Sequence, residues 1–156
     1  MMNANRKKPK ARIVKTCVAD NNNVVHTIEG GGEDYCRTPC LECPWRKDNT
    51  GKFPAQAFRI STNTAQDMSI HVFACHMRGA KHPATCAGFL LRGADDNLAV
   101  RTRRANGRMA DVGDGGHELH ESYKVMAVAN GCYENDPALK RCMPEARTKL
   151  EYKKGK

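Results

Sequence analysis

The stretch CRTPCLECPWR, residues 36–46, holds three of the eight cysteines and the single tryptophan of the chain. Two cysteines separated by two residues, as Cys40 and Cys43 are, can turn both sulfurs toward one cation in a tight loop, where backbone N–H groups hydrogen-bond those sulfurs. One such pair cannot close a tetrahedral site, so other ligands must come from elsewhere. The stretch therefore predicts a metal-binding loop that organises a small domain.

The further ligands are sought among the remaining cysteines. The best candidates are Cys75 in FACH and Cys86 in TCAGFLL, so the predicted set is Cys40, Cys43, Cys75 and Cys86, with the spacing C-x2-C-x31-C-x10-C. His76 can replace Cys75, but adjacent residues rarely bind one ion, and His76 ranks second. Cys36 is the reserve ligand.

The metal can be zinc or a 4Fe–4S cluster. Zinc favours four thiolates, whereas a close cysteine pair followed by proline, with scattered partners, also suits an iron–sulfur cluster. The C-x3-C-x2-C spacing is also that of radical S-adenosylmethionine enzymes, but these need a barrel of about 200 residues or more, which this chain cannot supply. We rank zinc first. Four protein sulfurs leave no open coordination position, which argues against catalysis at the metal.

Length and composition restrict the class of protein. The chain has 156 residues, of which 40% are hydrophobic and only 6% aromatic, so one small domain with a thin core is expected. No apolar run approaches the roughly 20 residues of a membrane span. The start of the chain lacks the apolar stretch of a secretory signal, so we expect a cytoplasmic protein, in which clustered thiols are more often metal ligands than disulfides.

The net charge of +9 is concentrated at the two ends. Residues 1–15 carry six Lys or Arg and no acid, and residues 140–156 carry seven against two Glu, whereas the middle is close to neutral. Such ends bind phosphate backbones electrostatically, or they are solvated tails that keep the protein soluble. The candidate nucleic-acid contacts are Lys7, Lys8, Lys10, Arg101, Arg103, Arg104, Arg108, Lys153 and Lys154.

The pattern along the chain predicts an α+β fold whose C-terminal half is rich in helices. We expect a disordered basic arm over 1–10, one domain over 11–143 and a basic tail over 144–156. Strands are predicted over 11–20, 23–29 and 70–75, and a helix or strand over 85–93. Helices are predicted from Pro54, from Asp95 or Asp96 to Arg104, over 117–131, and from Pro137.

Several other residues have two interpretations. His117 and His120 can bind a metal from one helix face, but a solvated face is favoured because no third ligand is near. Cys132 and Cys142 can form a second metal-binding clip or a disulfide, or they are free buried thiols, and Cys17 is expected to be a small core residue. Trp45 is favoured as plain core packing over a lid on the metal with Arg46.

A zinc deaminase would need H-x-E upstream of P-C-x-x-C. His26 is followed by Glu29 at the wrong spacing, and the 13 residues between His26 and Cys40 are too few for the chain to cross to the next helix. The deaminase interpretation is therefore excluded.

Three motifs in order carry a resemblance. The chain contains Pro39-Cys40-x-x-Cys43-Pro44-Trp45-Arg46 with Gly51 and Phe53, then Phe73-x-Cys75-His76, then Cys86-Ala87-Gly88-Phe89. This pattern resembles an uncharacterised family of small phage, prophage and actinobacterial proteins, over about Pro39 to Arg101. The resemblance implies a phage-type origin and four ligand positions, with Cys36 outside the pattern.

These observations favour a binding protein over an enzyme. We predict a small phage-type metal-binding accessory or regulatory protein that contacts nucleic acid, a host nucleic-acid enzyme, or both. The alternatives are an iron–sulfur redox protein and an inhibitor of a host protein that makes no nucleic-acid contact.

Overall fold

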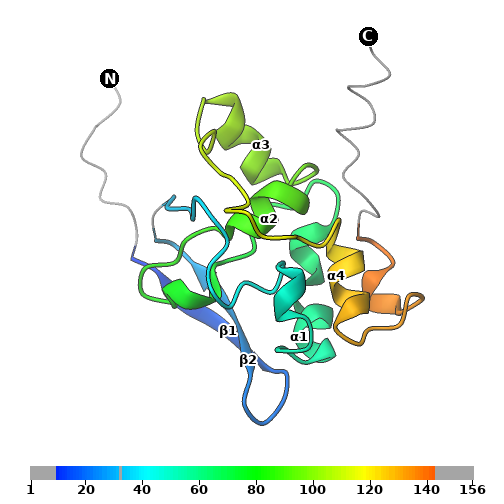
Figure 1. Ribbon diagram of the computed structural model, residues 1–156. Coiled ribbons are helices and arrows are strands. Elements are labelled where there is room, and N and C mark those ends of the chain that lie inside the picture. The colour runs from blue at the N-terminus through cyan, green and yellow to red at the C-terminus, as the bar shows by residue number, and fades with distance from the viewer. Residues whose placement is uncertain (1–9, 32, 143–156) are drawn as a thin grey trace.

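The computed structural model describes residues 10–31 and 33–142 and has a mixed α+β architecture, as predicted (Figure 1). Two strands come first, β1 (Arg12–Val18) and β2 (Val24–Glu29). Four short α-helices follow: α1 (Ala55–Ile60), α2 (Ala87–Arg92), α3 (Leu98–Ala105) and α4 (Tyr123–Ala129). Single turns of 3-10 helix, η1 to η4, lie at Lys47–Asn49, Ser61–Ala65, His76–Arg78 and Pro137–Leu139.

The two strands form an antiparallel hairpin beside the rest of the molecule, with β2 nearer the helices (Figure 1). Val18 lies opposite Val24, and the side chain of Asp20 accepts hydrogen bonds from the turn, from Asn22 N at 2.8 Å and Asn23 Nδ2 at 3.0 Å. Most hairpin side chains are exposed. Cys17 is half-buried in this hairpin, so its prediction as a core residue is wrong.

The remaining chain, residues 33–142, packs around Trp45 and is called the body here. The indole is fully buried and meets the rings of Phe73, Phe89 and Tyr123 at centroid distances of 6.0, 6.3 and 6.0 Å. Its Nε1 has no hydrogen-bond partner among the described residues, so packing alone holds it. The interpretation of Trp45 as plain core packing agrees with this arrangement.

Glycines on α2 and at its end make room for Trp45. A Cβ added to Gly88 would lie 2.4 Å from Trp45 Cβ, and one added to Gly93 would lie 2.4 Å from Trp45 Cη2. Real side chains do not approach this closely. The glycine of the CAGF motif therefore lets α2 lie directly against the indole.

The helix predicted over 117–131 is much shorter. Helix α4 begins only at Tyr123, where the Ser122 side chain accepts a hydrogen bond from Val125 N at 3.1 Å. The preceding segment is instead extended, because Leu119 pairs with Arg46 in a β-bridge and His120 N donates to Trp45 O. His117 and His120 therefore do not share a helix face, and that prediction is wrong.

Tertiary pairing also changes two other predicted elements. Residues 70–75 form no strand; the segment is extended and makes one β-bridge, Ala74 to Thr85. Helix α3 is capped by Asn97 rather than by Asp95 or Asp96, since the Asn97 side chain accepts from Val100 N at 3.1 Å and donates to His71 O at 2.7 Å. In the part of the chain that the structure describes, no helix has the length and apolar character required to cross a bilayer.

Candidate metal centre

Residues 40–43 form a tight turn, called the knuckle here, that local hydrogen bonds hold in place. Cys43 N donates to Cys40 O at 3.1 Å, which closes the turn. The buried Asn49 side chain donates to Leu41 O at 3.0 Å and to Cys43 O at 2.8 Å. These bonds satisfy the carbonyl groups of Cys40, Leu41 and Cys43, so the backbone of the turn is held in place without a metal.

Arg46 brings a buried positive charge to the knuckle. Its side chain is 9% exposed, donates to Cys40 O at 3.2 Å and pairs with Asp48 at 2.5 Å. The hydrogen bond to Asp48 raises the pKa of Arg46 despite its burial, and the nearby Cys43 and Cys40 thiols add to that effect. The guanidinium is therefore a permanent cation beside the sulfurs.

Two antiparallel segments bring the distant cysteines to the knuckle. Cys75 N donates to Ala84 O at 2.7 Å, and Cys86 N donates to Phe73 O at 2.8 Å. This pairing aligns the FACH and TCAGF motifs, and Cys86 is also the residue that precedes α2. Cys43, Cys75 and Cys86 are buried and Cys40 is half-buried. The structure thus gathers the four predicted ligands in one region.

The thiols form a continuous row that includes Cys36. Cys43 Sγ and Cys86 Sγ are 3.5 Å apart. The Cys40 thiol interacts with those of Cys43 and Cys75, and the Cys75 thiol interacts with that of Cys36. The order is Cys36, Cys75, Cys40, Cys43, Cys86, so the reserve ligand Cys36 lies at one end of the row.

The pKa values of Cys36, Cys40, Cys43 and Cys75 are all raised, which favours the protonated thiols. Burial, followed by the hydrogen bond with Cys75, raises the pKa of Cys36 to about 11. The hydrogen bond with Cys40 lowers the pKa of Cys43, but that with Cys86 and burial outweigh it, and the value is about 12. The pKa of Cys75 is raised by its bond to Cys40 and by burial. A metal ion must therefore displace protons here.

A row is not yet a coordination sphere. Among the residues with described positions, no three His, Cys, Asp or Glu side chains are arranged so that they could hold one ion. His76, the second-ranked ligand, lies 3.3 Å from Glu42 through Nε2 and packs edge-on against Phe53. Its half-exposed side chain is thus engaged outside the row, which disfavours His76 as a ligand.

Residues 35–143 match the model of a family of unknown function, DUF6283. The chain belongs to this family. No curated protein and no solved structure matches the chain. The match begins just before Cys36 and extends beyond Arg101, so it covers more of the chain than the resemblance did. The hairpin lies outside the DUF6283 match.

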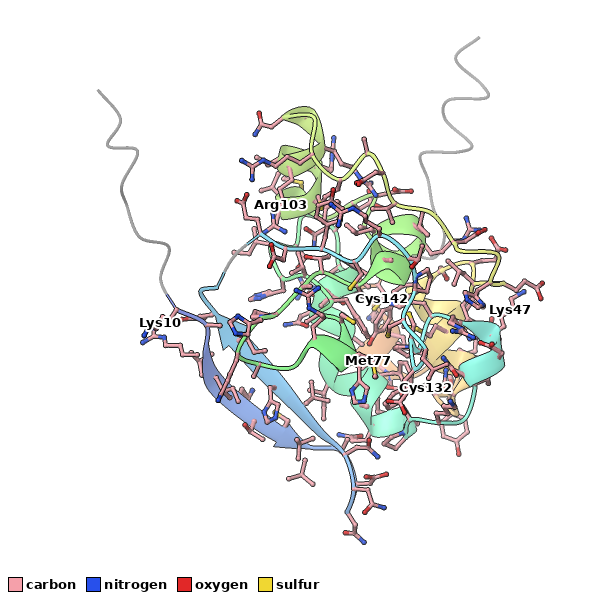
Figure 2. The ribbon with its side chains drawn as sticks, turned by 60° about the vertical axis from the view of Figure 1, so that its left-hand side comes forward. Lys10, Lys47, Met77, Arg103, Cys132 and Cys142 are labelled. Atoms are coloured by element: carbon pink, nitrogen blue, oxygen red, sulfur yellow. The ribbon has the colours of Figure 1, made fainter. Side chains whose placement is uncertain are left out.

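Two further cysteines within the DUF6283 match do not meet each other. Cys132 Sγ donates to Ala55 O at 3.4 Å, whereas Cys142 Sγ donates to Thr62 O at 3.8 Å (both labelled in Figure 2). Each thiol therefore has its own carbonyl partner, and both cysteines are free. The structure favours buried thiols over the second clip.

The internal arginines are mostly engaged within the molecule. Arg104 pairs with Asp95 at 3.3 Å and donates to Leu90 O, and Arg108 pairs with Glu33. Arg103 is half-buried against Thr85, which leaves Arg101 as the exposed member without an ion pair in the described chain. Lys10 is exposed at the start of the hairpin (Figure 2). The candidates Lys7, Lys8, Lys153 and Lys154 lie outside the described residues.

His120 is a buried polar residue whose environment sequence reasoning missed. Its Nε2 lies 3.2 Å from Thr50 Oγ1, and burial lowers its pKa, with a further contribution from Lys47. It is 4% exposed, and its backbone N donates to Trp45 O at 2.9 Å. Its position follows from the Arg46–Leu119 bridge, which no local sequence pattern predicts.

Proposed function

We propose that this protein binds one zinc ion through Cys40, Cys43, Cys75 and Cys86, and that the ion joins the knuckle to the start of α2. One observation carries the proposal: thiols from three separate segments meet in a row, with 3.5 Å between Cys43 Sγ and Cys86 Sγ. The ion is structural, because four protein sulfurs fill its coordination sphere.

The sulfur spacing favours zinc over a 4Fe–4S cluster. Zinc–sulfur bonds of about 2.3 Å in a tetrahedron hold neighbouring sulfurs about 3.8 Å apart. The Cys43–Cys86 separation is close to this value. Each cysteine of a 4Fe–4S cluster binds a different iron, which requires wider separation of the sulfurs.

Binding requires the row to close around the ion. Cys40 and Cys75 would have to turn about their Cα–Cβ bonds, and the bound thiols would lose their protons. Four thiolates and Zn²⁺ carry a net charge of −2. The guanidinium of Arg46 lies beside the knuckle, but Asp48 already balances its charge. Because binding and folding are coupled, the ion adds its binding free energy to the stability of a small domain.

The test is elemental analysis of anaerobically purified protein. Wild type and Cys17→Ser should each hold one equivalent of zinc, whereas Cys43→Ser should lose it and melt at a clearly lower temperature. Cys36→Ser should keep the metal if Cys36 is outside the ligand set. Full metal content in Cys43→Ser would refute the assignment. A brown product absorbing near 400 nm, roughly where thiolate-to-iron charge transfer falls, would favour the iron–sulfur alternative.

We further propose that the protein is a phage-type accessory or regulatory protein whose basic ends contact nucleic acid or a host nucleic-acid enzyme. The charge distribution supports this, because the ends hold the positive excess and two of the four internal arginines, Arg104 and Arg108, form ion pairs. Its site of action would be the cytoplasm.

Deletion of 1–10 and 144–156 tests the role of the ends. The deletion should abolish most binding to duplex DNA and reduce the salt slope by about 0.9 per lost phosphate contact. Zinc content should not change, because no proposed ligand lies in either segment. Unchanged DNA binding would indicate that Arg101 and the neighbouring arginines make the phosphate contacts instead. If the full chain does not bind DNA at low salt, the host-protein inhibitor becomes the better hypothesis.

A further inference from the structure

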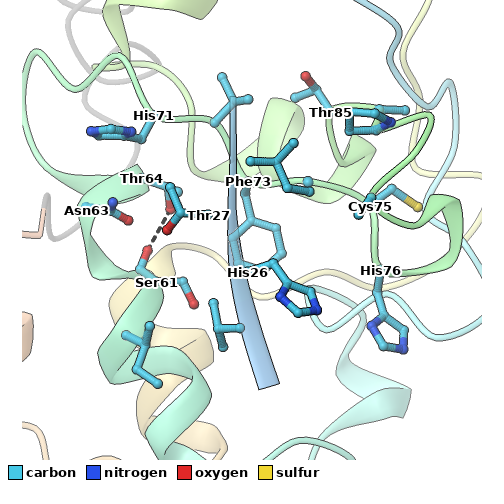
Figure 3. A pocket seen from close by; sticks show the side chains of 18 of the residues that line it. His26, Thr27, Ser61, Asn63, Thr64, His71, Phe73, Cys75, His76 and Thr85 are labelled. Carbon is cyan, nitrogen blue, oxygen red and sulfur yellow. Dashed lines mark hydrogen bonds between the residues drawn. The ribbon is translucent and has the colours of Figure 1, made fainter. Parts of the chain in front are cut away.

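A groove with a volume of about 430 Å³ runs between the hairpin and the body (Figure 3). One wall is β2 with the preceding Asn23, where residues 23–28 all line the cavity, and the other is the segment 70–76. Side chains of α1 and η2, including Phe58, Ile60 and Thr64, complete the lining. Successive side chains of an extended segment point to opposite faces, so a groove that touches one face alone is lined by every second residue. Both odd- and even-numbered residues of each wall line this groove, so the backbone edges of the two segments also face it.

Both edges lack a β partner within the described chain. β2 pairs with β1 on one side only. In the other wall, Phe73 O and Cys75 N bond to residues 86 and 84, whereas the backbones of Val72 and Ala74 make no hydrogen bond in the described ranges. This alternation is that of a strand with one paired and one open edge.

The groove also has an uncompensated positive charge. Arg103 lines it and is half-buried, yet the only hydrogen bond of its side chain within the described ranges is from Nη1 to Thr85 Oγ1 at 3.5 Å, and burial lowers its pKa. The carboxylate that lines the cavity, Asp34, faces Arg78 at 3.7 Å. By contrast, Arg104 and Arg108, on and just after the same helix, each have a carboxylate partner. The groove thus offers an unmatched guanidinium to an anionic group.

We propose that this groove binds an extended peptide segment of a partner protein, which adds as a strand between β2 and residues 72–74 and places an Asp or Glu side chain against Arg103. Backbone groups of Val72 and Ala74 would supply main-chain hydrogen bonds, and the apolar lining from Val25, Phe58 and Phe73 would receive small apolar side chains. Carboxylate and guanidinium form the strong, charge-assisted pair that Arg103 lacks. The proposal does not depend on zinc.

The probe is a defined library of acetylated, amidated hexapeptides with one central Glu and Ala, Val or Thr at every other position. The full-length ¹⁵N-labelled protein is titrated with this library and with a matched library containing Gln. The Glu library should shift the amide resonances of residues 24–28 and 72–74 and slow hydrogen exchange at Val72 and Ala74. The Gln library should bind about tenfold more weakly, as expected for loss of one charge-assisted hydrogen bond.

Two variants on α3 separate the role of Arg103 from general charge. Arg103→Gln should weaken binding of the Glu library about tenfold and remove the preference over Gln, whereas Arg101→Gln, on the same helix but outside the groove, should do neither. Thermal melts of both variants check that the fold is retained. If Arg103→Gln does not fold, comparison of the Glu and Gln libraries on the wild-type protein still shows whether binding requires a negatively charged side chain.

Backbone chemistry tests strand addition itself. One peptide of the Glu library that binds is made again with every second residue N-methylated. This peptide should not bind, because it lacks the backbone N–H donors that face one edge of the groove. Three results would overturn the proposal: no binding at millimolar peptide, shifts confined to β1, or equal binding by acetylglutamate amide alone. The last result would indicate a site for small anions instead.

Discussion

The body and the hairpin use similar apolar residues but are ordered in different ways. In the body, Trp45, Phe89 and Tyr123 are at most 1% exposed and pack ring against ring. In the hairpin, Val18 is 69% exposed and Ile13 is 46% exposed, so backbone pairing supplies most of its order. An isolated two-stranded hairpin is marginally stable in water. The hairpin therefore depends on its contact with the body, and not the reverse.

The boundary between the two regions coincides with the family boundary. The DUF6283 match begins at residue 35, after β2 ends at Glu29. The row of thiols lies within the match, whereas one wall of the groove comes from the hairpin. The proposed zinc site thus belongs to the body alone, and the proposed peptide site needs both regions.

The largest effect is expected where the body is most tightly packed. Gly88→Ala would place a Cβ 2.4 Å from Trp45 Cβ, an atom that cannot move without the backbone. Overpacking of this kind costs about 1–3 kcal/mol or more in unfolding free energy. Gly113→Ala is the control, because an added Cβ there meets no atom of the described residues within 4 Å. Urea unfolding measures both, and equal stabilities would show that the core around Trp45 is looser than described.

An intermediate effect is expected from alkaline pH on the metal-free body. Unfolded thiols ionise near pH 9.0, whereas Cys36 and Cys43 keep their protons in the folded state up to about 11 and about 12. Above pH 9 the folded state binds more protons, so the free energy of unfolding decreases as pH rises toward those values. Below pH 9 these thiols add no pH dependence.

Urea unfolding between about pH 8 and about pH 11 checks this dependence. Cys43→Ser should flatten it, and Cys17→Ser in the hairpin should not. Zinc-loaded protein should also resist the decrease, because the bound thiols are already ionised. An equal slope in metal-free wild type and Cys43→Ser would contradict the link between the row of thiols and alkaline stability.

The smallest effect is expected in the hairpin. Val18→Thr changes a side chain that is 69% exposed, so stability should shift by no more than about 0.5 kcal/mol. The same substitution at the fully buried Val100 places a hydroxyl in the core and should cost about 1–3 kcal/mol. Equal losses at the two sites would show that the hairpin packs more tightly than its exposure indicates.

The amino-acid sequence by itself determined the features that depend on neighbouring residues. The hairpin strands follow from two β-branched runs around an Asn-rich turn, and α2 ends before Gly93 as predicted. The residues of the knuckle could be predicted because a C-x2-C turn is a local structure. Cys75 and Cys86 were identified as ligands by residue type and order along the chain, although no local sequence pattern predicted that they would lie close to the knuckle.

Tertiary structure decided the features that depend on pairing between distant segments. The Arg46–Leu119 bridge shortened the helix predicted over 117–131 and buried His120, and pairing of 73–75 with 84–86 left residues 72 and 74 with an open edge. The ion pairs of Arg104 and Arg108, and the place of Cys36 beside Cys75, arise in the same way. The type of a residue determines which kinds of contact it can make, but the free energy of the whole packed structure determines which of these contacts forms.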